Sequence, residues 1–425
     1  MHKDFDITMG NLSKIEGHAS LDIKVRNDKV ESVKLRISEN KRFYSQAIRG
    51  KPFEGVPQLV SRICGTCSIA HLTCCTEAVE KALKIRPSEQ TILLRKLMTY
   101  GMMIRDHAMH LYLFCLPDIY GKDSILDFDE RQHEMVHNAF EVKKAGNDLS
   151  KLIGGRAVHP PYSQVGQFSH LPDKEETKKV LEDLKKVRAY VFELVKIFYD
   201  CDFSFRKKSR FVALTTPDFS FLEGVIKSSQ GFMIPEAHYW EHLQRVILPY
   251  SESAGFEMEG KDFMVGALSR MNLNREKLHR ETRRDLAKYI RMFPSENIYH
   301  NNLAQAIEIM HCIDHSIEIL ESNDFKPEPK PEFKIGKCRG VGVIEAPRGT
   351  LYYAISLEKD GRIDYGNLVI PTAQNQIKME NDIRTLVYQN LDKKRPFIKH
   401  EIEKLIRAYD PCMTCATHFL KVNWV

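Results

Sequence analysis

The sequence predicts an α+β fold, in which a bundle of long helices carries small β elements near the N-terminus and before the C-terminal helices. Two observations support this fold class. Apolar residues recur at three- and four-residue spacing over several stretches of about 20 to 30 residues, which is typical of amphipathic helices in a bundle. Near both ends of the chain, short runs instead resemble strands bounded by turn residues.

The first β element is a predicted hairpin. His18–Val25 and Lys29–Ser38 alternate apolar and polar residues on either side of Asn27-Asp28, a pair that favours a tight turn. After Pro57 the pattern becomes helical. The predicted helices are Leu94–Leu116, Glu130–Leu152, Lys174–Arg206, Lys261–Met292 and Ile298–Ser322.

A linker separates these helices from the last part of the chain. Residues 325–333 contain three prolines in nine residues. Three short predicted strands and two helices follow: Gly340–Pro347, Gly349–Leu357, Arg362–Pro371, Gln374–Asn390 and Lys394–Tyr409. We therefore expect an N-terminal β segment (1–56), a helical core (57–324) and a C-terminal β and helical segment (334–425), together forming one integrated domain.

Composition narrows the class of protein. Hydrophobic residues make up 43% and charged residues 28% of the 425 residues, the balance of a globular protein. The formal charge of +6 is modest, and we expect no nucleic-acid partner. No run approaches the roughly 18 apolar residues of a membrane span. The N-terminus lacks the apolar core of a secretory signal, so we expect a cytoplasmic protein with no transmembrane segment of its own.

The ten cysteines include two pairs of special interest. Cys64 and Cys67 form a Cys-x-x-Cys pair followed by His71, and Cys412 and Cys415 form another, followed by His418. This spacing lets two sulfurs converge on one metal ion. In a reducing compartment such pairs indicate metal or redox chemistry more often than disulfides.

The ligand types alone leave a structural zinc site, an iron–sulfur site and a redox dithiol open. The spacing argues against a local zinc site, because zinc ribbons place their pairs some 15–20 residues apart. Here 344 residues lie between Cys67 and Cys412. Closing such a loop costs about 5 kcal/mol unless the whole fold does so. The spacing therefore favours a central, functional metal centre.

With these motifs, the sequence resembles the large, catalytic subunit of nickel–iron hydrogenases. The resemblance depends on Arg-x-Cys-Gly-x-Cys-x-x-x-His at residues 62–71 and Asp-Pro-Cys-x-x-Cys-x-x-His at residues 410–418. Further segments appear in the family's order across nearly the whole chain: Ile15–His18, Arg105–His107, Gly154–Arg156 with His159-Pro160, and Glu345–Gly349.

The resemblance implies a nickel ion held by four thiolates, two of which bridge to an iron that carries small diatomic ligands. Carried over to this chain, Cys64 and Cys412 are terminal nickel ligands, and Cys67 and Cys415 bridge both metals. Thiolates are soft donors that place electron density on the metal. The assignment of nickel and iron comes from the resemblance.

The resemblance also implies roles for residues around the metals. Glu16 matches the family's proton gate, and Arg348 matches a guanidinium over the open coordination position. Asp106 and Asp410 match carboxylates that would keep this cation buried. His71 would hydrogen-bond near a bridging sulfur.

One position departs from the family pattern. His418 matches a ligand of a divalent ion, commonly magnesium, but Ser45 stands where the family has a carboxylate ligand after Arg42-Phe43-Tyr44. A hydroxyl is a poor ligand for a hard dication. This departure disfavours magnesium, unless Glu39 or water takes the place.

The implied function is that of the catalytic subunit of a cytosolic nickel–iron hydrogenase, which interconverts dihydrogen with protons and electrons. The remaining cysteines lack ferredoxin-type clustering, so an iron–sulfur small subunit would carry the electrons, and further electron-transfer subunits would follow. A maturation protease would cut between His418 and Phe419. Two alternatives share this fold: an electron-transfer or coupling subunit related to complex I, and a non-catalytic hydrogen sensor.

Overall fold

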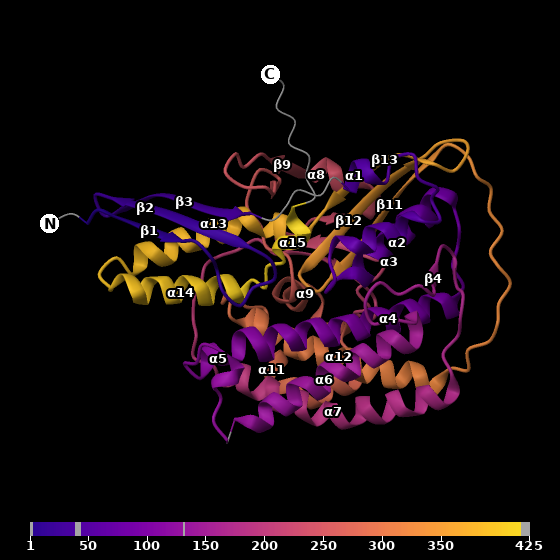
Figure 1. The fold of residues 1–425 in the computed structure, drawn as a ribbon, viewed down its shortest axis with the longest axis horizontal. Helices are drawn as coiled ribbons and strands as arrows, with labels where there is room; N and C mark the ends of the chain where they lie inside the picture. Colours follow the sequence, from indigo (N-terminus) through magenta and orange to yellow (C-terminus); the bar gives the residue numbers. More distant parts are fainter. Residues whose placement is uncertain (1–2, 39–43, 131, 418–425) are drawn as a thin grey trace.

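The computed structural model describes residues 3–38, 44–130 and 132–417. The predicted α+β class is confirmed, because long helices are combined with small, separate sheets (Figure 1). Among the described residues, no helix has the length and apolar character needed to cross a bilayer.

Four long helices form the bundle in the lower half of Figure 1. Each has an apolar face toward the others, as the three- and four-residue spacing predicts. Asp173 caps the third of them, since its carboxylate accepts hydrogen bonds from the backbone of Glu175 and Glu176. The four are α4 (Glu89–Ala108), α6 (His133–Gly154), α7 (Lys174–Asp200) and α12 (His300–Ser322).

The predicted helices are confirmed for these four, whereas the predicted helix Lys261–Met292 is wrong. A π-helical stretch, Met109–Cys115, continues α4 within the predicted range. Residues 261–292 do not form one helix. They contain three short ones instead, α9 (Ala267–Asn274), α10 (Arg280–Asp285) and α11 (Ala287–Ile290).

The N-terminal strands form the predicted hairpin and one strand more. In the sheet β1-β2-β3 all neighbours are antiparallel, and β1 (Phe5–Met9) was not predicted. Strands β2 (Ala19–Arg26) and β3 (Lys29–Ile37) are joined through Asn27 and Asp28, whose φ angles of 50° and 59° suit a tight hairpin turn.

The N-terminal sheet lies beside the C-terminal helices α13 (Pro371–Gln389) and α14 (Arg395–Ala408) in Figure 1. The backbone N–H of Leu35 donates to Glu380, and Gln376 donates to the carbonyl of Leu35. These contacts join the two ends of the chain. The division into 1–56, 57–324 and 334–425 stays a prediction.

A second antiparallel sheet, β11-β12-β13, packs on α3 (Ser68–Leu83), a helix whose range was not predicted. Its strands are Cys338–Ala346, Gly349–Leu357 and Ile363–Val369, as predicted. Gly342 allows the close approach, because a Cβ there would lie 2.3 Å from the carbonyl oxygen of Cys74. Sheet and helix together place Arg348 and Cys67 in one region.

The other elements are short. Several lie between residues 212 and 258, where the sequence predicted neither strand nor helix. The strands are β4 (Ser163–Gln164), β5 (Gln167–Phe168), β6 (Val212–Thr215), β7 (Val225–Ser228), β8 (Met233–Ile234), β9 (Leu243–Val246) and β10 (Gly255–Met258). The helices are α1 (Tyr44–Ala47), α2 (Val56–Val60), α5 (Leu116–Ile119), α8 (Tyr239–His242) and α15 (Met413–Ala416).

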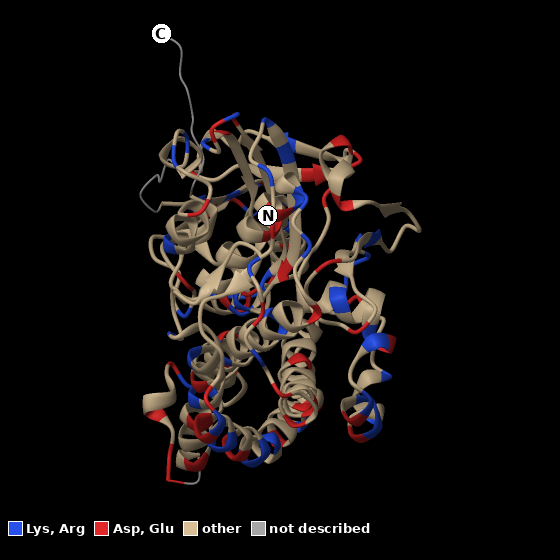
Figure 2. Cartoon of the chain, turned by 90° about the vertical axis from the view of Figure 1, so that its right-hand side faces the viewer, with Lys and Arg blue, Asp and Glu red and all other residues tan. Residues whose placement is uncertain are grey.

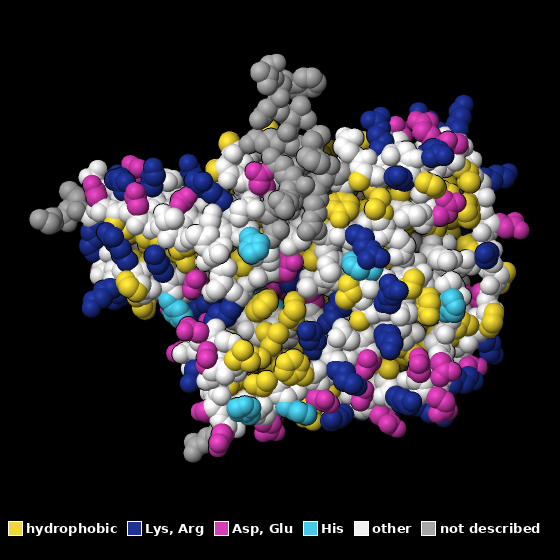
Figure 3. Space-filling model, in the orientation of Figure 1, with side chains coloured by type: hydrophobic (Ala, Val, Ile, Leu, Met, Phe, Trp, Pro, Cys, Tyr) yellow, Lys and Arg dark blue, Asp and Glu magenta, His cyan; other side chains and the backbone are white. Residues whose placement is uncertain are grey.

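Charged residues of both signs alternate along the outer helices (Figure 2). The space-filling view shows the same mixture, with apolar side chains in separate groups (Figure 3). On the faces shown, the modest positive charge is therefore distributed rather than gathered into one basic stripe.

Candidate metal centre

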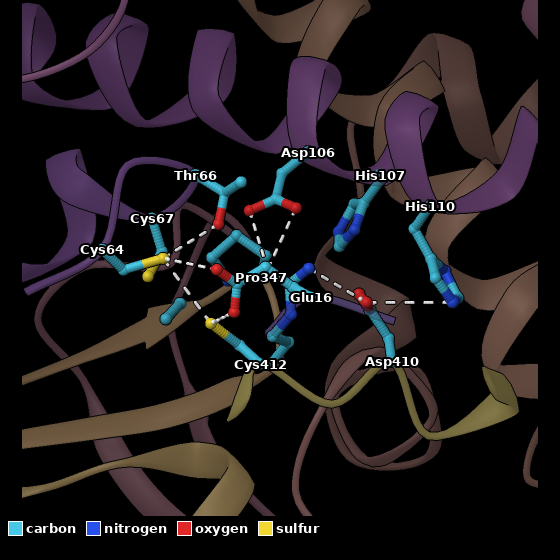
Figure 4. Close-up of polar contacts among 12 residues, drawn as sticks. Glu16, Cys64, Thr66, Cys67, Asp106, His107, His110, Pro347, Asp410 and Cys412 are labelled. Carbon is cyan, nitrogen blue, oxygen red and sulfur yellow. Dashed lines mark hydrogen bonds and ion pairs between the residues drawn. The ribbon is translucent and has the colours of Figure 1, made fainter. Parts of the chain in front are cut away.

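The two Cys-x-x-Cys segments meet inside the protein. Cys64 follows a short 3-10 turn, Cys67 and Cys412 directly precede α3 and α15, and Cys415 lies within α15. All four are buried, and their sulfurs lie within 4.8 Å of one another. The Sγ atoms of Cys67 and Cys415 are 3.0 Å apart. Those of Cys64 and Cys412 are 3.6 Å apart (Figure 4). The fold thus closes the 344-residue gap.

The segment around Glu16 holds the C-terminal pair in place. Glu16 and Cys412 form a parallel β-bridge, in which Met413 N–H donates to the Glu16 carbonyl at 2.9 Å. Gly17 has a φ of +82°, and a Cβ there would lie 2.9 Å from the backbone nitrogen of Thr414. Only glycine fits this turn without displacing the cysteine segment.

The Glu16 side chain points at the sulfurs (Figure 4). Its Oε2 lies 2.9 Å from Cys412 Sγ and accepts a hydrogen bond from Thr414 N–H at 3.2 Å, while Oε1 lies 3.9 Å from Cys64 Sγ. Burial raises the pKa of Glu16, and the negative charge of Cys64 raises it further. The residue as a whole is only partly buried.

Arg348 is buried between two carboxylates. Its Nη1 donates to both oxygens of Asp106, at 3.0 and 2.8 Å, and its Nη2 lies 3.0 Å from Oδ1 of Asp410. Burial alone would lower the pKa of Arg348, but Asp106 and Asp410 outweigh it and hold the pKa above its ordinary value. The guanidinium is therefore a fixed cation.

His71 lies on the other side of the sulfurs. Its Nε2 is 3.6 Å from Cys415 Sγ, and its Nδ1 is 2.8 Å from the hydroxyl of Tyr353. If the tyrosine O–H donates to Nδ1, then Nε2 carries the proton and donates toward the sulfur. Burial raises the pKa of Tyr353, which keeps the phenol protonated for this role.

A small cavity adjoins the sulfurs. Arg348 lines this cavity, and its buried Nε and Nη2 have no hydrogen-bond partner among the described residues, so the guanidinium retains donors that these residues do not use. Four soft sulfur donors beside this space fit a thiolate-bound metal centre with small ligands. The lining residues include Cys67, Ala70, His71, Ala346, Pro347, Arg348, Leu351, Cys412 and Cys415.

The structure adds contacts that the sequence analysis missed. Thr66 Oγ1 lies 3.1 Å from Cys64 Sγ, and its place inside the Cys-x-x-Cys pair was a usable signal. Gln305 donates to Asp410 at 2.8 Å, and Tyr353 contacts His71. These two are distant in sequence from their partners, so no spacing indicates them.

Some predicted site residues lie outside the described part of the chain. These are His418, the proposed ion ligand, and Glu39, Arg42 and Phe43 near the position of the missing carboxylate. Ser45 lies in α1. The expectation that magnesium is disfavoured therefore stays a prediction.

The remaining cysteines form no further site in the described residues. No disulfide joins the described cysteines, and the four-cysteine cluster is the one group of potential metal ligands found there. Cys74, for example, donates to the carbonyls of Gly342 and Leu351, as expected for a buried thiol that acts as a small hydrophobic residue.

The chain is similar to known proteins over almost its whole length. It is 31% identical to the alpha chain of sulfhydrogenase 1 from Pyrococcus furiosus, with 98% of each chain covered. It is 28% identical to one chain of the F420-non-reducing hydrogenase of Methanothermobacter thermautotrophicus, with 97% of this chain and 94% of the relative covered.

Solved structures share the fold. An NAD⁺-reducing [NiFe]-hydrogenase in the H2-reduced state superposes with a TM-score of 0.84 at 22% identity, covering 98% of this chain and all of the other. An H2-activated [NiFeSe]-hydrogenase of Dm. baculatum gives a TM-score of 0.77 at 19% identity, with 98% and 100% covered.

A model of one protein family, the nickel-dependent hydrogenases, matches residues 42–152 and 243–418, more than half of the chain and both cysteine pairs. With this match and the 31% identity over the full length, the chain belongs to the nickel-dependent hydrogenase family.

Proposed function

We propose that this chain is the catalytic subunit of a nickel–iron hydrogenase, and that Cys64, Cys67, Cys412 and Cys415 hold its nickel–iron centre. The observation that carries the proposal is the buried cluster of four thiols, drawn from both ends of a chain that belongs to the nickel-dependent hydrogenase family. When bound, the centre supplies the electrophile for heterolytic cleavage of dihydrogen.

The surroundings of the sulfurs support the division into terminal and bridging ligands. Glu16 faces Cys412 and Cys64, the proposed terminal pair, while His71 faces Cys415, a proposed bridging ligand. A proton acceptor belongs beside the terminal thiolates, because these have electron density left to bind a proton. Cys67 and Cys415, which would hold the iron, both line the adjoining cavity.

Proton transfer is the proposed task of Cys412 and Glu16. The distance of 2.9 Å between Cys412 Sγ and Glu16 Oε2 lets a proton pass from sulfur to carboxylate without movement of the backbone. The raised pKa of Glu16 brings it closer to neutral pH, where a relay can both accept and release a proton.

Arg348 is the proposed fixed cation at the cavity. Asp106 and Asp410 hold the guanidinium in one orientation, so it can stabilise negative charge that develops in the reaction without reorganising. The proposed role of His71 is to orient its N–H toward Cys415 and to lower the electron density of that sulfur.

Electrons leave through a partner in this proposal. The described residues contain no second cysteine cluster, so an iron–sulfur small subunit would receive the electrons. The named relatives include F420-non-reducing and NAD-reducing hydrogenases, which indicates that the partner chains set the acceptor. The absence of disulfides among the described cysteines is consistent with a reducing compartment, and we propose the cytoplasm.

We also propose that maturation removes residues 419–425 after His418. Residues 419–425 directly follow the histidine of the second cysteine motif, where the resemblance places the cut. The intact mass of the active protein decides this point. Active enzyme that retains Trp424 and Val425 would show that the last residues belong to the mature fold.

Metal analysis of the purified chain, together with a turnover assay of the complex, tests the function. Nickel and iron in equal amounts in this chain, together with dihydrogen-dependent reduction of a viologen dye, are the expected results. Zinc alone, or no metal, would exclude the hydrogenase. A metal-loaded complex without turnover would instead indicate the sensor.

A further inference from the structure

Arg270, on α9, uses every N–H of its guanidinium in a hydrogen bond. The residue is buried, with 1% of its surface exposed. Its Nε donates to Glu308 Oε1 at 2.7 Å. Its Nη1 donates to Glu345 Oε2 at 2.8 Å and to the Ala346 carbonyl at 3.0 Å, and its Nη2 donates to Glu308 Oε2 at 2.7 Å and to the Pro347 carbonyl at 3.0 Å.

Two of these acceptors are backbone carbonyls directly before Arg348. Ala346 ends β11 and Gly349 begins β12, so the carbonyls belong to the turn that carries Arg348. The side chain of Arg348 is held by carboxylates, while Arg270 holds its backbone from the N-terminal side. A planar fork can bind both carbonyls and a carboxylate together, which a single ammonium group cannot do.

Glu308 connects the same unit to the partner of Arg348. Its Oε2 also lies 2.9 Å from Nε2 of His107, the residue that follows Asp106 in α4. Burial would raise the pKa of Glu308, but Arg270 and His107 hold it at about 2, so the carboxylate is charged. The Arg270–Glu308 ion pair thus contacts both the turn that carries Arg348 and the helix α4 that carries Asp106.

Energetics favour a geometric role for this unit. Burying one cation with two carboxylates is costly and is often no more stabilising than apolar packing of the same volume. Burial raises the pKa of Glu345, and the opposing effects of Arg270 and of the Thr350 hydrogen bond do not fully offset it. The charged form of Glu345 is therefore costly to bury. What the arrangement gives in return is a fixed direction for each of the guanidinium's hydrogen bonds.

We propose that Arg270 is a positioning residue for Arg348, acting through the Ala346 and Pro347 carbonyls and, through Glu308 and His107, on Asp106. The inference rests on the proposed hydrogenase function. A displacement of about 1 Å in a positioned group costs up to about 100-fold in rate, so the fixed turn matters for turnover.

The test is a double-mutant cycle on the assembled, nickel-loaded complex. Arg270→Lys, Arg348→Lys and the double variant are compared with the wild type in dihydrogen turnover and in nickel and iron content. Arg95→Lys is the matched control. Arg95 is buried and pairs with Glu80 through both Nη atoms, but it contacts neither Arg348 nor Asp106.

We expect Arg270→Lys to lower turnover about 10- to 100-fold at unchanged metal content, and Arg95→Lys to leave it within about twofold. In the Arg348→Lys background, Arg270→Lys should cause less than about a twofold further loss, because the residue it positions is gone. If Arg270→Lys lowers turnover by the same factor in the wild type and in Arg348→Lys, the proposal is wrong. Equal factors mean that the two substitutions act independently, as a purely structural effect of Arg270 would.

Crystal structures give a readout that does not depend on activity. In Arg270→Lys, the Arg348 guanidinium should lose its two-point contact with Asp106, whereas an unmoved guanidinium would contradict the proposal. If Arg270→Lys does not assemble, Glu308→Gln keeps the side-chain shape and allows the same cycle and crystals. An inactive wild-type complex would refute the proposed function, whereas an active one with an additive cycle would refute only this inference.

Discussion

At the residue scale, the candidate metal centre contains residues that the sequence predicted and contacts that it did not predict. The four cysteines and Glu16 belong to recognisable motifs, and the structure brings them together. Tyr353 and Gln305 were missed because their roles depend on tertiary contacts with residues that lie far away in the chain. A single sequence carries no spacing that joins such pairs.

Replacing a proposed bridging ligand should remove the metals. In Cys67→Ser, a hard hydroxyl replaces a soft thiolate, so we expect the chain to lose its nickel. Turnover should fall by more than about 100-fold, because replacing even a residue that only hydrogen-bonds to a metal ligand costs about 10- to 100-fold. Cys74→Ser is the control, because serine can donate to the same carbonyls. Full nickel content in Cys67→Ser, measured by mass spectrometry of the metals, would refute the ligand assignment.

The proton relay can be separated from metal binding. Glu16→Gln keeps the size of the side chain but cannot take up a proton, so hydrogen–deuterium exchange should slow about 10²- to 10⁴-fold with the metals in place. Glu380→Gln removes another largely buried carboxylate whose pKa burial raises, and should exchange at the wild-type rate. Wild-type exchange in Glu16→Gln would remove the residue from the mechanism.

At the element scale, sequence patterns predicted the amphipathic helices and failed where burial or tertiary contact dominates. α3 is buried on nearly all sides, so it has no polar face to produce a helical period. Residues 261–292 break at Leu278 and His279, whose ψ angles of 153° and 144° are not helical. The His279 ring then caps α10 by accepting a hydrogen bond from the backbone N–H of Glu281, so the chain starts a new helix there.

Two buried histidines of α12 should make the free energy of unfolding depend on pH. Burial, with help from His315 and His279, lowers the pKa of His311 to about 3, and burial lowers that of His315 to about 4. Both are therefore neutral in the fold but take up protons once unfolded, below the ordinary histidine pKa of about 6.5. Stability is full above pH ~6.5 and falls as the pH drops toward 4.

The measurement is the unfolding midpoint as a function of pH. His311→Gln should flatten the acid limb by up to one proton, or about 1.4 kcal/mol per pH unit. His137→Gln changes an exposed histidine of α6 and should leave the slope as in the wild type. An unchanged slope in His311→Gln would show that this histidine is not the group that takes up the proton.

At the scale of the whole molecule, the fold is what joins two chain ends into one site. The N-terminal sheet packs against α13, and the Glu16 segment pairs with the segment of Cys412. The α+β class was predicted correctly from the sequence, and the structure brings the two cysteine segments together in one buried cluster. How the ends meet could not be predicted, because sheet-to-helix packing and a single β-bridge leave no periodic signal.

The proposed site stands or falls on whether four cysteines of this chain hold nickel and iron together. Anomalous diffraction from crystals of the complex, recorded at the nickel and iron absorption edges, locates both metals independently of activity. We predict a nickel peak within bonding distance of all four cysteine sulfurs. We predict an iron peak within bonding distance of two of these sulfurs, those of Cys67 and Cys415. A zinc peak at this position, or a nickel peak away from these sulfurs, would contradict the assignment.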